Sequence, residues 1–174
     1  MEQKKPIGHI AAGLIIGLVL IPYSCALYFT NTQQTGIYGW LPIIFIIIGL
    51  IAFVNLYGKA LNNEVTFGNL FAYGFKTTAF LTLIVIAFTV IFFLAFPDIK
   101  EKIVESARQK MEEKGNLTED EIDKGIASFR KMFWVYSIGG VLLVYAIIGA
   151  IGSLIGAAIT PKKPVNPIDQ LDMR

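Results

Sequence analysis

The chain contains three long stretches without a charged residue. Asp, Glu, Lys and Arg are all absent between Lys5 and Lys59, between Lys76 and Asp98, and between Lys131 and Lys162. About 20 residues of apolar helix cross the roughly 30 Å hydrocarbon core of a bilayer, and each of these stretches is long enough. A soluble domain of 174 residues would have to expose part of this surface to water. The missing charges therefore exclude an ordinary soluble fold and predict an integral membrane protein.

The chain also has few residues that carry chemistry. Cys25 is the only cysteine and His9 the only histidine, which excludes an internal disulfide and a thiolate metal site. We interpret Cys25 as an apolar filler within a helix and His9 as an interfacial residue. No GxSxG or HExxH motif is present. We therefore expect no catalytic residue, metal or cofactor, and a net charge of +2 without a basic stripe argues against nucleic-acid binding.

The uncharged stretches divide into four predicted membrane spans. The polar, turn-rich segment 30–36 splits the first stretch in two. The predicted spans are residues 9–30, 38–57, 70–96 and 133–160. Pro97 and Pro161 are expected to end the last two spans, because proline has no N–H to continue a helix. We expect the first span to be retained as an anchor, since no Ala-x-Ala cleavage site follows it. The predicted fold is an all-α bundle of four transmembrane helices, one membrane domain over 1–174 with a short tail at 161–174.

The only long polar stretch, residues 98–131, lies between the third and fourth predicted spans. It contains eight Lys or Arg and nine Asp or Glu, well mixed. Apolar residues recur at helical spacing in both halves: Ile99, Ile103, Ala107 and Met111, then Ile122, Ile126, Phe129 and Phe133. Residues 114–116 (Lys-Gly-Asn) are expected to form a C-cap, and Thr118 to Glu121 form a capping-box signature. The pattern predicts a helical hairpin that runs straight into span four, with its stripes packed together or laid on the membrane surface.

The distribution of lysines favours a cytoplasmic N-terminus. Lys4 and Lys5 precede span one, and the connector after that span has no charge, as the positive-inside rule requires. The later connector lysines then fall on the same side: Lys59, Lys76, Lys162 and Lys163. Trp40 and Trp134, at the starts of spans two and four, are expected to be interfacial anchors on the hairpin side. With four spans, both termini are expected in the cytoplasm.

Glycines are the most informative residues in the spans. Gly13 and Gly17 form a GxxxG pattern in span one, and Gly152 and Gly156 form another in span four, extended by Gly149. Such spacing lets two helix backbones approach closely in lipid. Two interpretations stay open: span one packs against span four within the monomer, or these faces form the interface of a homo-oligomer or with a membrane protein partner.

A second candidate site surrounds Pro22, which removes one helical hydrogen bond and is expected to kink span one. Hydroxyls near the kink suggest a small polar pocket, with these candidates: Ser24, Thr78, Thr82, Tyr145 and Ser153. The simpler alternative is that Ser and Thr hydroxyls bond back to their own helices.

The segment Val65–Gly68, with Phe71 and Gly74, opens a long third span that ends at Phe96, Pro97 and Asp98. A charged helical stretch and a glycine-rich last span follow. In these features the chain resembles the domain of unknown function 4199 family, over nearly its whole length. The resemblance implies a four-span protein of the bacterial cytoplasmic membrane and carries no assigned activity or catalytic residue.

Three functions are considered. The first is a non-catalytic structural, assembly or partner-binding protein, whose spans and hairpin bind other proteins or copies of itself. The alternative is a small oligomeric transporter or channel for an unidentified solute, which requires a polar cavity reaching mid-membrane. The third, a membrane-embedded enzyme, requires clustered polar side chains near His9 or Tyr145.

Overall fold

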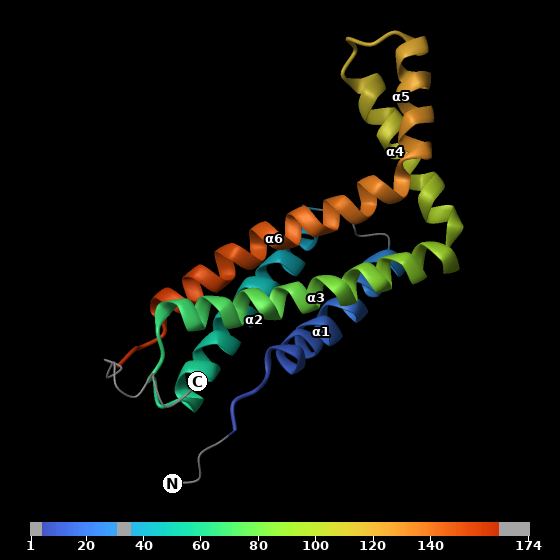
Figure 1. Ribbon diagram of the computed structural model, residues 1–174. Coiled ribbons are helices and arrows are strands. Elements are labelled where there is room, and N and C mark those ends of the chain that lie inside the picture. Colours follow the sequence, from blue (N-terminus) through green and yellow to red (C-terminus); the bar gives the residue numbers. More distant parts are fainter. Residues whose placement is uncertain (1–4, 31–35, 164–174) are drawn as a thin grey trace. The chain divides into compact units, whose positions relative to one another are not determined.

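The computed structural model describes residues 5–30 and 36–163, and within them the chain is helical and contains no strand. The helices are α1 (His9–Phe29), the 3₁₀ turn η1 (Gly36–Gly39), α2 (Leu41–Ala60), α3 (Phe67–Ala95), α4 (Pro97–Glu113), α5 (Glu119–Lys131) and α6 (Phe133–Ile159) (Figure 1). The all-α prediction is confirmed for this part of the chain. The predictions for Lys4, for most of the connector 30–36 and for the tail beyond residue 163 lie outside the described residues.

Four of these helices, α1, α2, α3 and α6, are long and apolar enough to cross a membrane. The four-span prediction is therefore confirmed, with the starts of α2 and α3 adjusted and the end of α2 at Ala60 instead of residue 57. Helix α2 begins at Leu41, after η1, with Pro42 in its first turn, where the missing N–H is harmless. Helix α3 begins at Phe67 because the Thr66 hydroxyl accepts the Asn69 N–H at 3.2 Å and so caps the helix.

Proline ends the last two spans as expected. Helix α3 stops at Ala95, and Pro97 then opens α4, since a first-turn residue needs no amide donor. Helix α6 stops at Ile159, two residues before Pro161. Its last carbonyls are bonded by the Lys162 ammonium, which donates to Ala157 O at 2.6 Å and Thr160 O at 2.8 Å. A cation at this end also complements the helix dipole.

The chain forms two compact units. The first comprises residues 1–85 with 144–174, and its described helices are α1, α2, the first part of α3 and the last part of α6. Its core holds two groups of buried apolar side chains: Ala12, Val54, Val65, Leu70, Tyr73 and Ala157, and Ile16, Leu20, Ile46, Leu50, Leu81 and Ile148. Many large apolar side chains point outward, Leu18 and Leu83 among them, as expected for helices that face lipid.

The second unit, residues 86–143, contains the predicted hairpin, in which α4 and α5 lie side by side (Figure 1). Its core consists of Val104, Ile122 and Ile126, packed with Ala107, Met111 and Phe129. The hairpin prediction is confirmed, and its apolar stripes pack on each other. One assignment was wrong: Val104 enters this core instead of Ile103. A helix turns every 3.6 residues, so a strict four-residue spacing drifts off the buried face.

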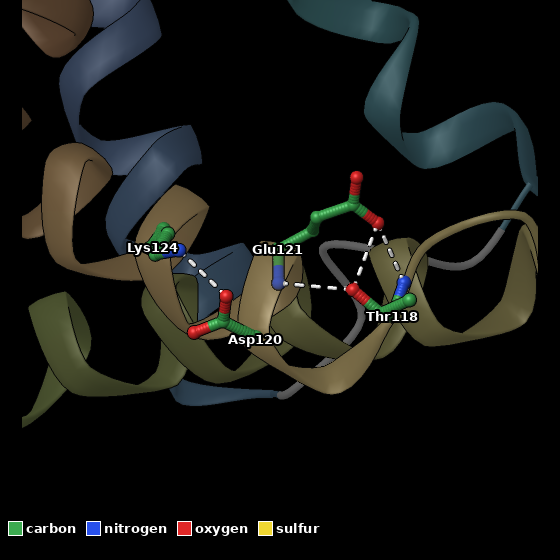
Figure 2. A network of polar contacts seen from close by, with 4 residues as sticks. All are labelled: Thr118, Asp120, Glu121 and Lys124. Atoms are coloured by element: carbon green, nitrogen blue, oxygen red, sulfur yellow. Dashed lines mark hydrogen bonds and ion pairs between the residues drawn. The ribbon is translucent and has the colours of Figure 1, made fainter.

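The turns of the hairpin also follow the sequence signals. Gly115 has a φ of +64°, the left-handed conformation that suits glycine after a helix end. Figure 2 shows the capping box at the start of α5, where the Thr118 N–H donates to the Glu121 carboxylate at 2.8 Å and the Thr118 hydroxyl accepts the Glu121 N–H. Only Met132 separates α5 from α6, close to the predicted direct connection.

Candidate functional site

The glycine face of span four packs inside the first unit. A Cβ added to Gly152 would lie 2.9 Å from a Leu50 methyl of α2, and one on Gly156 would lie 3.1 Å from Val54 Cβ. A Cβ on Gly149 would overlap the side chain of Thr78 in α3. Helices α2 and α3 therefore cover this face at van der Waals distance.

The glycine face of span one packs against α3. A Cβ on Gly13 would lie 3.1 Å from the Thr77 carbonyl oxygen, and the nearest atoms to one on Gly17 belong to Leu81 and Ile84. The predicted pairing of spans one and four through their glycines is therefore wrong, although both faces pack within the monomer.

The missed partner surface is a row of small residues on α3. Gly74, Thr78 and Thr82 repeat every four residues, which is the same small-residue spacing with threonine in place of glycine. Gly74 is so close to α6 that an added Cβ would lie 2.6 Å from Ser153 Oγ. Counting threonine as a small residue would have found this surface in the sequence.

The residues predicted to line a pocket beside Pro22 have separate surroundings. The Thr78 and Thr82 hydroxyls donate to carbonyls one turn back in α3, Gly74 O at 3.1 Å and Thr78 O at 2.8 Å. This is the simpler alternative of back-bonding to the same helix. Pro22 and Ser24 are exposed on α1, which continues through Pro22.

The two other pocket candidates lie in or against the packed interior. Tyr145 packs against the core group that contains Leu81 and Ile148. Ser153 is fully buried, and its hydroxyl oxygen has no hydrogen-bond partner among the described residues. The predicted pocket residues thus belong to the packed helix interfaces or to the outer surface of α1.

A cavity of about 250 Å³, lined by both polar and apolar residues, lies elsewhere in the first unit, beside the starts of α1 and α3. Its lining residues are Pro6, Ile7, Gly8, His9, Tyr57, Asn69, Ala72, Tyr73 and Lys76. Of these residues, the enzyme hypothesis named only His9, as a position near which polar side chains would have to cluster. The interfacial interpretation of His9 is compatible with this place, because α1 begins at that residue.

Two tyrosines hold the wall of the cavity in place. The Tyr73 hydroxyl of α3 donates to the Ile7 carbonyl at 3.0 Å and so ties the segment before α1 to α3. The Tyr57 ring of α2 stacks on the Tyr73 ring, with 4.1 Å between centroids and 11° between planes. Contacts from three helices therefore shape the cavity, and Ile7 and Tyr73 are 66 residues apart in the chain.

The lining of the cavity is rich in hydrogen-bond donors and carries positive charge. Lys76 contributes an ammonium, His9 an imidazole and Asn69 an amide. None of the described residues that line it is acidic, and it offers no thiol or aliphatic hydroxyl. The described residues contain no group of His, Cys, Asp and Glu suited to a metal ion. In chemical terms the lining is suited to an anion.

The hairpin presents a different kind of surface, charged and linked by ion pairs. Arg108 of α4 contacts Asp123 of α5 at 2.9 Å, and Arg130 of α5 contacts Glu101 of α4 at 2.6 Å. The hydrogen bond from Arg108 to Glu112 and the charge of Asp123 raise the pKa of the Arg108 guanidinium. The capping box lowers the pKa of Glu121, mainly because the Thr118 N–H donates to the ionised carboxylate.

Comparison with known proteins identifies a family for this chain. The family model described as a protein of unknown function (DUF4199) matches residues 11–162. The chain belongs to the DUF4199 family. No curated protein and no solved structure matches it. The resemblance seen in the sequence is thereby confirmed, and membership assigns no activity.

The structure explains the segment on which the DUF4199 resemblance was based. Val65 is buried in the core, and Thr66 caps α3 through its hydroxyl. Gly74 provides the close contact with Ser153 of α6. These residues start the third span and bring it into contact with α6. Asn69, which follows Gly68, lines the cavity.

Proposed function

We propose that this DUF4199 protein is a non-catalytic, multi-pass membrane protein that binds a protein partner through its α4–α5 hairpin. The observation that carries the proposal is the hairpin's own core. Val104, Ile122 and Ile126 bury the apolar stripes of both arms, which leaves a polar outer surface held in one shape. Such a surface suits a protein partner in water.

Preorganisation of the hairpin supports this function. Two ion pairs join its arms, Arg108 with Asp123 and Arg130 with Glu101, and a capping box starts α5. A Cβ on Gly125 would lie 3.4 Å from the Met111 sulfur, so the arms are also closely packed. A binding element that is already ordered loses less conformational entropy when its partner binds.

The packing of the spans favours the hairpin over the glycine faces as the partner surface. The glycine faces first considered as partner surfaces are occupied by neighbouring helices of the same chain. The alternative of a transporter or channel was based on a polar pocket with Thr78 and Thr82. Their hydroxyls bond to their own helix, and Leu50 and Leu81 lie in the same apolar core, so these contacts do not favour that alternative.

We further propose that the protein lies in the bacterial cytoplasmic membrane with both termini in the cytoplasm and the hairpin outside. The lysine distribution supports this orientation. With four spans, the connector between α2 and α3 lies on the same side of the membrane as the two termini. Lys59 precedes that connector and Lys162 follows α6, so both lysines lie on this side. Accessibility of single cysteines placed in a Cys25→Ala background, at residue 109 and at residue 5, to an impermeant maleimide tests it. Labelling of residue 5 but not of residue 109 in intact cells contradicts the orientation.

Partner binding can be tested by site-specific photo-crosslinking in living cells. A photoreactive residue at Gln109 or Ala127 lies on the exposed surface of each arm without removing a charge. Lipid-facing Leu83 and Leu154 serve as matched controls. We expect an adduct of defined mass from both hairpin positions and not from the controls.

The shape of the hairpin should be required for that adduct. Ile126→Asp places a charge in the hairpin core and should abolish the adduct, whereas Leu117→Asp at the exposed turn should preserve it. No adduct from either hairpin position, or the same adduct from Leu83 and Leu154, contradicts the proposal.

A further inference from the structure

We infer that the cavity between the start of α1 and the first turns of α3 binds a phosphate group, that of an anionic phospholipid headgroup or free phosphate. Both sources present the same chemistry, a compact anion whose oxygens accept hydrogen bonds. The cavity lies wholly within the first unit and is independent of the hairpin.

The charge of the lining is the first argument. Lys76 supplies an ammonium, His9 adds a ring that donates at least one hydrogen bond, and no described lining residue is acidic. A cavity with a cationic side chain and no carboxylate in its described lining favours an anion over a cation or a neutral solute.

The donors of the lining are the second argument, because the unprotonated oxygens of a phosphate group accept hydrogen bonds. Asn69 offers an amide NH₂ and Tyr57 a phenolic hydroxyl. The start of α1 adds backbone donors, since its N-cap is Gly8, which has no side chain to accept them. The first intrahelical bond of α1 runs from Ala12 N to Gly8 O, so the amides before it lack a helical acceptor. The positive end of the helix dipole adds to the attraction.

Size and place are the third argument. A volume of about 250 Å³ is below the roughly 300–1,000 Å³ of sites for drug-sized ligands, and it suits a small group. Helix α1 begins at His9 and α3 at Phe67, so the cavity lies at the ends of two spans, where lipid headgroups are found. Basic pockets between spans are known sites for phosphate-bearing headgroups.

Lys76→Gln is the principal test, on the full-length protein in neutral detergent. The apparent affinity is measured from the rise in Tm during titration with phosphatidylglycerol, with phosphatidylcholine as the zwitterionic reference. A parallel titration uses inorganic phosphate against chloride at equal ionic strength. We expect Lys76→Gln to weaken binding about tenfold or more, as for loss of a charge-assisted hydrogen bond.

Lys59→Gln is the matched control, because Lys59 is an exposed lysine in the last turn of α2 that does not line the cavity. It should bind as the wild type does. A Lys76-dependent effect of phosphatidylglycerol alone identifies the headgroup as the ligand, and one of inorganic phosphate identifies free phosphate.

A steric variant keeps every charge and fills the cavity. Ala72→Phe should abolish the ligand-dependent rise in Tm, while Ala72→Ser should preserve it. The inference is overturned if the wild type responds to neither ligand. It is also overturned if Lys76→Gln and Ala72→Phe, folded by their basal Tm, respond as the wild type does.

Discussion

The span bundle and the hairpin are opposite in what they expose. The span bundle here means α1, α2, residues 67–85 of α3 and residues 144–159 of α6; the hairpin means α4 and α5. Large apolar side chains such as Leu18 and Leu83 are exposed on the bundle, whereas on the hairpin the exposed residues are mainly charged. Each exterior matches its solvent, lipid for the bundle and water for the hairpin.

The interiors differ for the same reason. In the hairpin, Val104, Ile122 and Ile126 gain from leaving water, so ordinary apolar contact suffices. In the bundle there is no such gain, because lipid is as apolar as the core, and association depends on close van der Waals contact. Glycines packed against threonine or serine provide it, as where Gly149 meets Thr78 and Gly74 meets Ser153. One chain thus uses two packing strategies, chosen by solvent.

We expect the largest difference between bundle and hairpin when the same charge is introduced on the exposed surface of each. Leu83 is 62% exposed near the middle of α3, and Leu83→Lys should disfavour membrane insertion by about 2.5–3.5 kcal/mol. The matched change on the hairpin, Ala127→Lys, should alter stability by no more than about 0.5 kcal/mol. The measurement is the fraction of each variant integrated into membranes. Equal integration of the two variants would show that Leu83 does not face lipid.

Enlarging a glycine tests the close packing of the bundle, with a smaller effect. Gly149→Leu should lower the free energy of unfolding by about 1–3 kcal/mol, because the new side chain collides with Thr78 and threonine is stiff at χ1. Gly139→Leu lies on the same helix with nothing within 4 Å of its Cβ position and serves as the control. Unfolding is followed in detergent. Leucine has a higher helix propensity than glycine, so propensity alone would stabilise both variants. Equal loss in both variants would mean that the collision with Thr78 does not explain the effect.

The smallest expected effect is the pH dependence of the capping box at the start of α5, in the hairpin. The folded hairpin lowers the pKa of Glu121, so its capping box is fully stabilising above the unfolded-state pKa of this carboxyl. That stability should be lost as the pH falls through the lower folded-state pKa. Amide hydrogen exchange in the first turn of α5 measures it. Glu121→Gln keeps the capping box without titrating, so its protection should not change over this range. An identical pH dependence in both proteins would assign the effect to another group.

Most of the architecture was predictable, because its signals are local. The lengths of the uncharged stretches located the spans, and Pro97 and Pro161 marked their ends. In the hairpin, apolar spacing and the Thr118 capping box predicted both arms. The error at Ile103 came from applying a four-residue repeat where the helix period is 3.6.

The candidate site was much less predictable. Proximity to Pro22 suggested a pocket, but the threonine hydroxyls bond within α3. The cavity that does form joins His9 to Lys76, residues far apart in the chain, and neither carries a motif. Their meeting depends on the Tyr73 hydroxyl reaching Ile7, a contact that no periodicity reports.

By itself, the sequence determined which segments are apolar enough to lie in lipid, which are polar, and approximately where each helix begins and ends. These properties depend on the solvation of individual residues and on hydrogen bonds within one or two turns. Only the tertiary structure decided that the glycines of α1 and α6 pack on α2 and α3, and that three helices shape a cationic cavity. Several small-residue faces have nearly the same spacing, so only the fit of side-chain shapes in three dimensions selects among them.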